Sequence, residues 1–123
     1  MGYIVPAAPF VDPKATPVAK AANATLTAAN CNGNNITNTG AGAGITLTLP
    51  AASAAAGCAF RVQVTVAQTV TVDPTTGKIY LGGSGVADKT LGIAGVIGNF
   101  AEIYSDGVDW MVTNYAGVLT KEA

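Results

Sequence analysis

Residues capable of acid–base or nucleophilic chemistry are few in this 123-residue chain, and histidine is absent. Its absence removes the commonest general base, the Ser–His–Asp and Cys–His arrangements, and most zinc and iron sites. Asp106 and Asp109 come closest to a carboxylate pair, but Asp-Gly-Val-Asp is typical of a β-turn, where Asp forms local hydrogen bonds. A calcium ion takes about six to eight oxygen ligands, more than this stretch offers. The sequence therefore predicts a protein that is not an enzyme and has no metal, cofactor or small-molecule substrate.

The two cysteines, Cys31 and Cys58, lack a neighbouring base or a metal-ligand spacing. Free buried thiols are the default interpretation, because no secretory signal precedes them. A single Cys31–Cys58 bridge is the alternative if the assembled protein resides outside a cell. The glycine-rich run 82–85 lacks the Gly-Lys-Ser/Thr ending of a phosphate loop, so it is expected to connect two strands.

Among the aromatic residues, Phe60 and Phe100 lie in apolar alternations and are expected in the core. Trp110 and Tyr115 are the only candidates for a platform that stacks against a carbohydrate. Core or interface packing is the favoured interpretation for both, because aromatic side chains contribute most by burying apolar area.

Alternation of apolar and polar residues predicts the elements around these residues. It is clearest from Phe60 to Val66, where period two fits a strand and not a helix. Further strands are expected at 23–28, 45–49, 69–73, 79–81, 99–105 and 108–113, with at most one helical turn at 51–56. A tight hairpin is expected at Ala67-Gln68 and another at Asp106-Gly107. About eight short strands predict an all-β domain over residues 23–123, a small antiparallel sandwich, jelly roll or barrel.

Residues 1–22 have a different composition, with prolines at positions 6, 9, 13 and 17. Proline lacks an N–H and favours an extended preceding residue, so this segment is predicted to be an extended N-terminal arm. The arm contains apolar residues expected to contact a neighbouring subunit or another partner surface: Tyr3, Ile4, Val5, Phe10 and Val11.

Only 11% of the residues are charged, against about 25% in average soluble domains, and half are hydrophobic. This composition favours a surface that becomes buried between proteins, the alternative being a neutral domain coated with Thr and Asn. The six Lys and Arg residues are scattered, which argues against nucleic-acid binding. No apolar run approaches the ~20 residues of a membrane span, and no secretory signal is evident, so synthesis in a cytoplasm is expected.

The stretch from Ala24 to Tyr115 resembles a β-domain found in bacteriophage virion proteins. The resemblance lies in Thr25-Leu26-Thr27, the segments 36–41 and 45–52, the Phe60 strand, the segment 67–74 and the closing Trp110 strand. It is similar to capsid decoration (cement) proteins and to modules of tail fibres. The resemblance implies a homotrimer on the capsid surface of a virion, bound to the major capsid protein and synthesised in the host cytoplasm.

Two functions remain in view. The first is capsid decoration, with the arm and one β-face holding the shell. The second is a receptor- or glycan-binding module of a tail fibre or adhesin that uses Trp110 and Tyr115. The lack of a long fibrous or coiled-coil segment favours the first.

Overall fold

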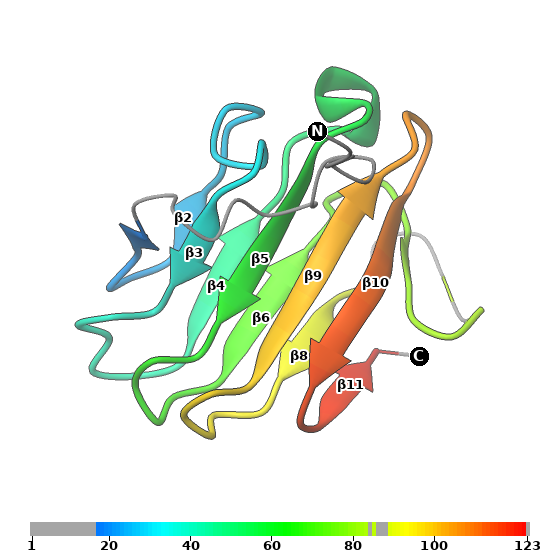
Figure 1. Ribbon diagram of the computed structural model, residues 1–123. Coiled ribbons are helices and arrows are strands. Elements are labelled where there is room, and N and C mark those ends of the chain that lie inside the picture. Colours follow the sequence, from blue (N-terminus) through cyan, green and yellow to red (C-terminus); the bar gives the residue numbers. More distant parts are fainter. Residues whose placement is uncertain (1–16, 84, 86–88, 123) are drawn as a thin grey trace, which may run out of the picture.

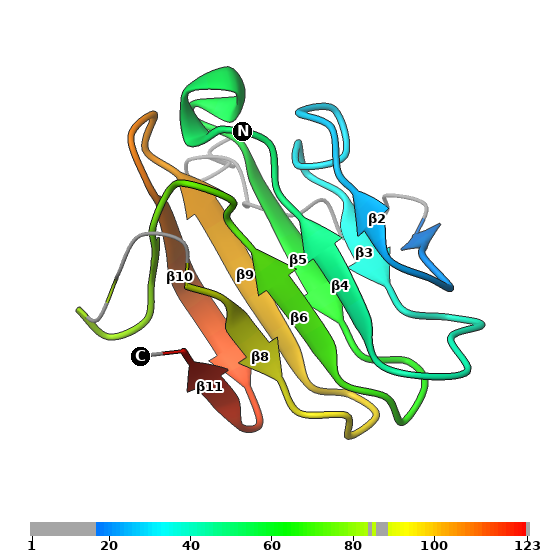
Figure 2. The same cartoon turned by 180° about the vertical axis from the view of Figure 1, so that it is seen from behind.

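The computed structural model describes residues 17–83, 85 and 89–122 as two β-sheets packed face to face (Figure 1). The six-stranded front sheet has the order β1 (Val18–Ala19), β3 (Asn35–Thr37), β5 (Ala59–Gln63), β9 (Phe100–Ser105), β10 (Trp110–Ala116) and β7 (Ile79–Tyr80). The five-stranded back sheet, nearer the viewer in Figure 2, has the order β11 (Leu119–Lys121), β8 (Leu91–Ile93), β6 (Val70–Asp73), β4 (Ile45–Thr48) and β2 (Ala24–Thr25). The expected all-β sandwich is confirmed.

The strands form because alternate side chains enter the space between the sheets. In β4, Ile45 and Leu47 are buried while Thr46 and Thr48 are half-buried on the outer face. β6 and β9 repeat this pattern. The single helical element in the described part of the chain is the short 3-10 turn η1 (Ala52–Ala55), as the bounding Pro50 and Gly57 led us to expect.

The first six strands form a flat coil. The chain passes from one sheet to the other after each strand, and in each sheet β1, β3, β5 and β2, β4, β6 pair in parallel. The remaining strands add to this coil mainly in antiparallel fashion: β9 pairs with β5, β8 with β6, β10 with β9 and β11 with β8. The antiparallel pairing expected from the sequence therefore holds for most of the C-terminal half, where β7 and β10 are a parallel exception, whereas the N-terminal half is a parallel coil.

The expected hairpin at Ala67-Gln68 is wrong, because β5 and β6 lie in different sheets. Val62 and Val70 are both fully buried, so the two strands face one another across the core. Ala-Gln also lacks the residues that adopt the positive φ of a tight two-residue hairpin. The hairpin expected at Asp106-Gly107 is confirmed: β9 and β10 pair there, with Trp110 opposite Ser105.

The N-terminal boundary of the domain also differs from the expectation. Val18 and Ala19 pair with Ile36 and Thr37, and the Lys20 N–H donates to the Thr37 carbonyl at 2.8 Å. The front sheet therefore begins directly after Pro17, within the segment predicted as arm, because the residues after the last proline have N–H groups that join a ladder.

Candidate interaction surfaces

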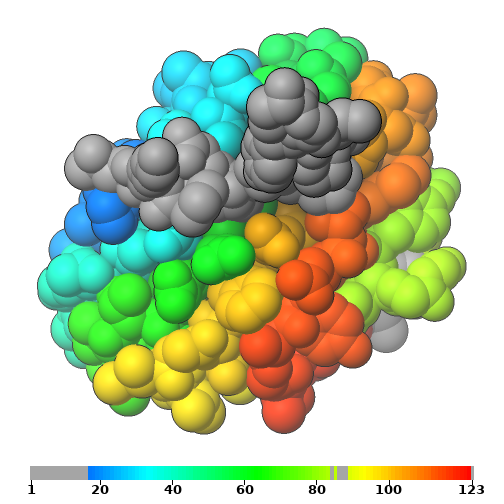
Figure 3. All heavy atoms as spheres, in the orientation of Figure 1, coloured from blue at the N-terminus to red at the C-terminus, as the bar shows by residue number. Residues whose placement is uncertain are grey.

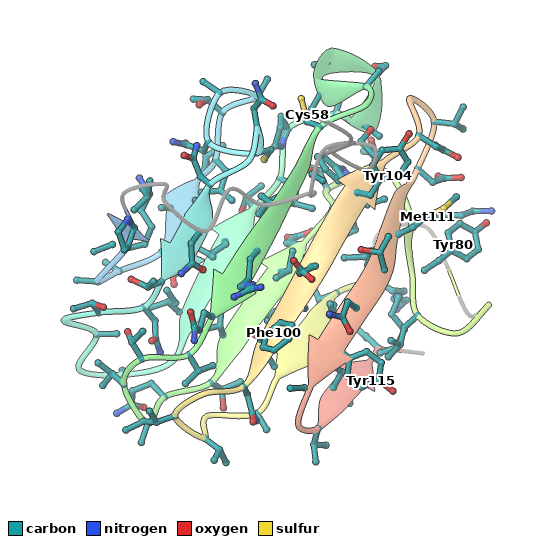
Figure 4. All side chains as sticks on the ribbon, viewed as in Figure 1. Cys58, Tyr80, Phe100, Tyr104, Met111 and Tyr115 are labelled. Atoms are coloured by element: carbon teal, nitrogen blue, oxygen red, sulfur yellow. The ribbon has the colours of Figure 1, made fainter. Side chains whose placement is uncertain are left out.

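The predicted contact residues fall in three different environments. Tyr3, Ile4, Val5, Phe10 and Val11 lie outside the described residues. Trp110 is 0% exposed. Tyr115 is 50% exposed near the end of β10 (Figure 4), where it lies opposite Ala101 of β9.

Because Trp110 is buried, it cannot serve as the glycan-binding platform that the alternative function requires. Its ring meets Phe60 edge to face, with centroids 5.8 Å apart, and its indole Nε1–H donates to the Pro50 carbonyl at 3.3 Å. Both the apolar ring and the polar N–H therefore have partners inside the domain. The interpretation of Trp110 as a core residue agrees with the structure.

One end of the sandwich is built from five loops that cross between the sheets, here called the arch end. Its loops are residues 20–23, 38–44, 64–69, 94–99 and 117–118. Backbone bonds join neighbouring loops: the Gly98 N–H donates to the Val64 carbonyl at 2.9 Å, and the Ala94 N–H to the Val118 carbonyl at 3.1 Å. The loops 64–69, 94–99 and 117–118 lie side by side along the lower edge of Figure 3.

Asn38 links two of these loops. Its side chain is fully buried, and Oδ1 accepts the N–H groups of Thr65 at 2.8 Å and Val66 at 3.0 Å. Its Nδ2 donates to the carbonyls of Val66 at 2.9 Å and Gln68 at 3.1 Å. A buried amide is tolerated when its donors and acceptors are paired, and Asn38 meets this condition. The sequence analysis did not identify it.

The arch end carries most of the large apolar side chains that are exposed among the described residues. Val96 is 61% exposed, Ile97 67% and Val118 66%, and Tyr115, two residues before the loop 117–118, is 50% exposed. Lys20 is the only charged residue in the five loops, all of which the structure describes. An apolar, nearly uncharged surface of this kind is typical of the core of a protein–protein interface. In the sequence, the aliphatic pair Val96-Ile97 between Gly95 and Gly98 could have indicated this apolar surface.

The outer face of the front sheet has a different chemistry. Arg61 lies 3.4 Å from Glu102, and its guanidinium carbon is 4.6 Å from the centre of the Phe100 ring. The expectation that Phe100 lies in the core is therefore wrong: it is half-buried and alternates with the inward-facing Ala101. The other carboxylate oxygen of Glu102 accepts from Asn114 Nδ2 at 3.1 Å. These cross-strand partners largely satisfy one another, as expected for a hydrated sheet face. Tyr104 and Met111 project from the same face in Figure 4.

The outer face of the back sheet is coated with threonine. Thr46, Thr71 and Thr120 lie in one row across the sheet with Gly92 between the last two, and Thr25 and Thr48 lie in the next row with Asp73. A shallow hollow of about 390 Å³ beside β2 is lined by small and polar residues: Asn23, Ala24, Thr25, Thr46 and Thr48. This face matches the neutral Thr/Asn-coated surface considered from composition. Its side chains offer hydroxyl and amide hydrogen bonds.

The described residues contain no group of three or more His, Cys, Asp or Glu side chains placed to hold a metal. Asp106 caps its own turn: Oδ1 accepts the N–H groups of Val108 and Asp109, both at 2.8 Å. These bonds, that from Asp109 foremost, hold the pKa of the Asp106 carboxyl below its usual value. Asp106 is therefore a turn residue, as predicted. No helix in the described part of the chain is long and apolar enough to cross a membrane.

Cys31 and Cys58 are not bonded to each other in the structure. Cys31 is fully buried and Cys58 is half-buried. Burial, with a smaller contribution from the neighbouring Cys58, raises the pKa of Cys31 to about 12. Cys31 is therefore protonated at neutral pH.

No known family model and no curated protein sequence matches this chain.

Proposed function

We propose that this protein is a structural component of a bacteriophage virion, a capsid decoration protein that acts as a homotrimer. The observation that supports the proposal best is the arch end, where Val96, Ile97 and Val118 are exposed on a nearly uncharged surface. An apolar, nearly uncharged surface favours association with another protein, which is the property expected of a protein that works within an assembly.

The arch end suits contact between identical copies. Around a symmetry axis the same surface of each copy comes close to the next, so charges of one sign would repel. With Lys20 as its only charged residue, the arch end avoids this cost. The exposed aliphatic side chains then supply apolar area for burial, at roughly 25 cal/mol per Å² removed from water.

The N-terminal arm supplies the proposed contact with the major capsid protein. It enters the domain at β1, an edge strand of the front sheet, so its attachment point is on the periphery of the sandwich. Sixteen residues at ~3.1 Å each reach roughly 50 Å in extended form. An arm on each of three copies would attach the trimer to several capsid subunits at once and raise its effective affinity.

The glycan-binding alternative has less support. With Trp110 buried, Tyr115 is the remaining aromatic of the two candidates. A carbohydrate platform needs aromatic area together with polar groups that fix orientation. The hollow beside β2 supplies polar groups and no aromatic ring.

The proposed trimer contact is tested with Ile97→Asp. Ile97 is 67% exposed, so the variant is expected to fold, while a carboxylate at the arch end should repel its symmetry copies and convert the trimer to monomer. Light scattering at micromolar concentration measures the mass, and circular dichroism verifies the fold.

Val108→Asp is the matched control. Val108 is 75% exposed in the β9–β10 turn at the opposite end of the sandwich (Figure 1), and its variant should remain trimeric. A monomeric native protein, or a trimer that survives Ile97→Asp, would refute an interface at the arch end.

A further inference from the structure

The two thiols lie at the end of the sandwich opposite the arch end, in the segments that precede the neighbouring parallel strands β3 and β5. The pairing of β3 with β5 continues beyond β3: the Gly33 N–H donates to the Ala59 carbonyl at 2.7 Å, and the Arg61 N–H to the Asn34 carbonyl at 3.0 Å. Cys58 directly precedes Ala59, and Cys31 lies two residues before Gly33. Cys31 ends a turn in which its N–H donates to the Ala28 carbonyl at 3.1 Å, so both cysteines lie next to the point where the two segments come together.

Both side chains also face the same core. Cys58 has the strand parity of Phe60, Val62 and Val64, whose side chains are fully buried between the sheets. Cys31 belongs to the buried core cluster, and Cys58 packs against that cluster. Cys58 is also near enough to Cys31 to contribute to its raised pKa.

We propose that Cys31 and Cys58 are a modification site, at which a disulfide oxidant such as glutathione disulfide converts the two free thiols into an intramolecular bridge. The bridge would tie the loop before β3 to the start of β5, joining two successive turns of the parallel coil. The proposal does not depend on the proposed function. For a protein outside a cell, however, oxidising surroundings would favour the bridged form.

The exchange proceeds in two balanced steps. The thiolate of Cys58, the more accessible cysteine, attacks one sulfur of glutathione disulfide, and one glutathione leaves as its thiolate. Cys31 then loses its proton and attacks the Cys58 sulfur of the mixed disulfide, which releases the second glutathione. The protein loses two electrons and two protons, and glutathione disulfide is reduced to two thiols. Because the pKa of Cys31 is about 12, the second step should be slow at neutral pH and faster in alkali.

The experiment incubates the full-length protein with glutathione disulfide at about pH 9, alkylates remaining thiols after denaturation, and measures intact mass. The expected product is a monomeric chain two hydrogen atoms lighter, with no alkyl group and no glutathione. Its thermal midpoint should rise by at least about 5 °C and return on reduction, since a bridge restricts the unfolded chain.

Single variants identify the order of attack. Cys31→Ser should stop at a mixed disulfide on Cys58, whereas Cys58→Ser should leave Cys31 unmodified under the same conditions. If Cys31→Ser fails to fold, Cys58→Ser and the native protein still decide the question. Full alkylation of both thiols in the native protein, a persistent glutathione adduct, or a bridge between two chains would each overturn the proposal.

Discussion

At the scale of single residues, Asn38 has the clearest structural role in the arch end. Its amide bonds to three residues of the loop 64–69 and leaves neither its oxygen nor its nitrogen unpaired. The loop crosses between the sheets, so its backbone groups cannot all join a ladder. Asn38 supplies partners that a strand neighbour would otherwise provide.

Asn38→Ala should lower the free energy of unfolding by about 2–5 kcal/mol, because buried N–H and carbonyl groups of the loop 64–69 lose their partners. Urea denaturation measures the change. Asn114→Ala is the control: Asn114 is exposed, its bond to Glu102 lies at the surface, and its loss should change stability by about 0.5 kcal/mol or less. Equal effects of the two substitutions would contradict the assigned role of Asn38.

A second residue-scale feature is the contact between Gly117 and Asn99. Gly117 has a φ of +91°, and a Cβ there would overlap the Asn99 side chain, whose Nδ2 donates to the Ala94 carbonyl at 3.1 Å. Gly98 has a similar φ of +100°, but a Cβ at that position would have no neighbouring atom within 4 Å. Substitutions at Gly117 and Gly98 can therefore be compared to separate the cost of a positive φ from the cost of steric overlap.

Gly117→Ala should therefore destabilise the protein more than Gly98→Ala, by about 1–2 kcal/mol, since only the former displaces the Asn99 amide from its hydrogen bond. Both substitutions carry the same cost of a positive φ. Thermal unfolding of the two variants measures the difference. Equal midpoints would show that Asn99 moves aside without loss.

At the scale of elements, the direction of strand pairing decides the architecture. In β5, the alternation of Phe60 and Val62 with Arg61 identifies the inner and outer faces correctly. It does not identify the neighbours, which are β3 in parallel and β9 in antiparallel orientation. The successive turns of the coil differ in length, since β1, β3 and β5 begin at Val18, Asn35 and Ala59.

The close approach of two arches gives a prediction at this scale. A Cβ on Gly95 would lie 2.7 Å from the Gln68 carbonyl carbon and 2.8 Å from the Thr69 nitrogen. Both atoms belong to the backbone, so neither can move aside alone. Gly95→Ala should therefore separate the loops 64–69 and 94–99 and increase amide hydrogen exchange in both. Unchanged exchange rates in both loops would contradict this contact.

At the scale of the whole molecule, the proposed attachment to a capsid depends on residues 1–16 rather than on the sandwich. Deletion of these residues leaves Val18 and Ala19 in the front sheet, so the domain should remain folded. Binding to undecorated shells should weaken at least about tenfold, because the arm's contacts and its tethering are lost. Co-sedimentation with shells measures binding, and unchanged binding would refute the proposed role of the arm.

The sequence by itself determined the β class, the faces of strands such as β5, the Asp106-Gly107 turn and the low charge of the surface. These follow from local rules, since alternation and turn residues act over a few neighbouring positions. Only the tertiary structure decided that β5 and β6 lie in opposite sheets, that Trp110 is enclosed, and that Val96, Ile97 and Val118 share one exposed end. The reason is physical: the partner of a strand and the exposure of a side chain depend on segments far away in the chain, which come together only when both sheets close around the core.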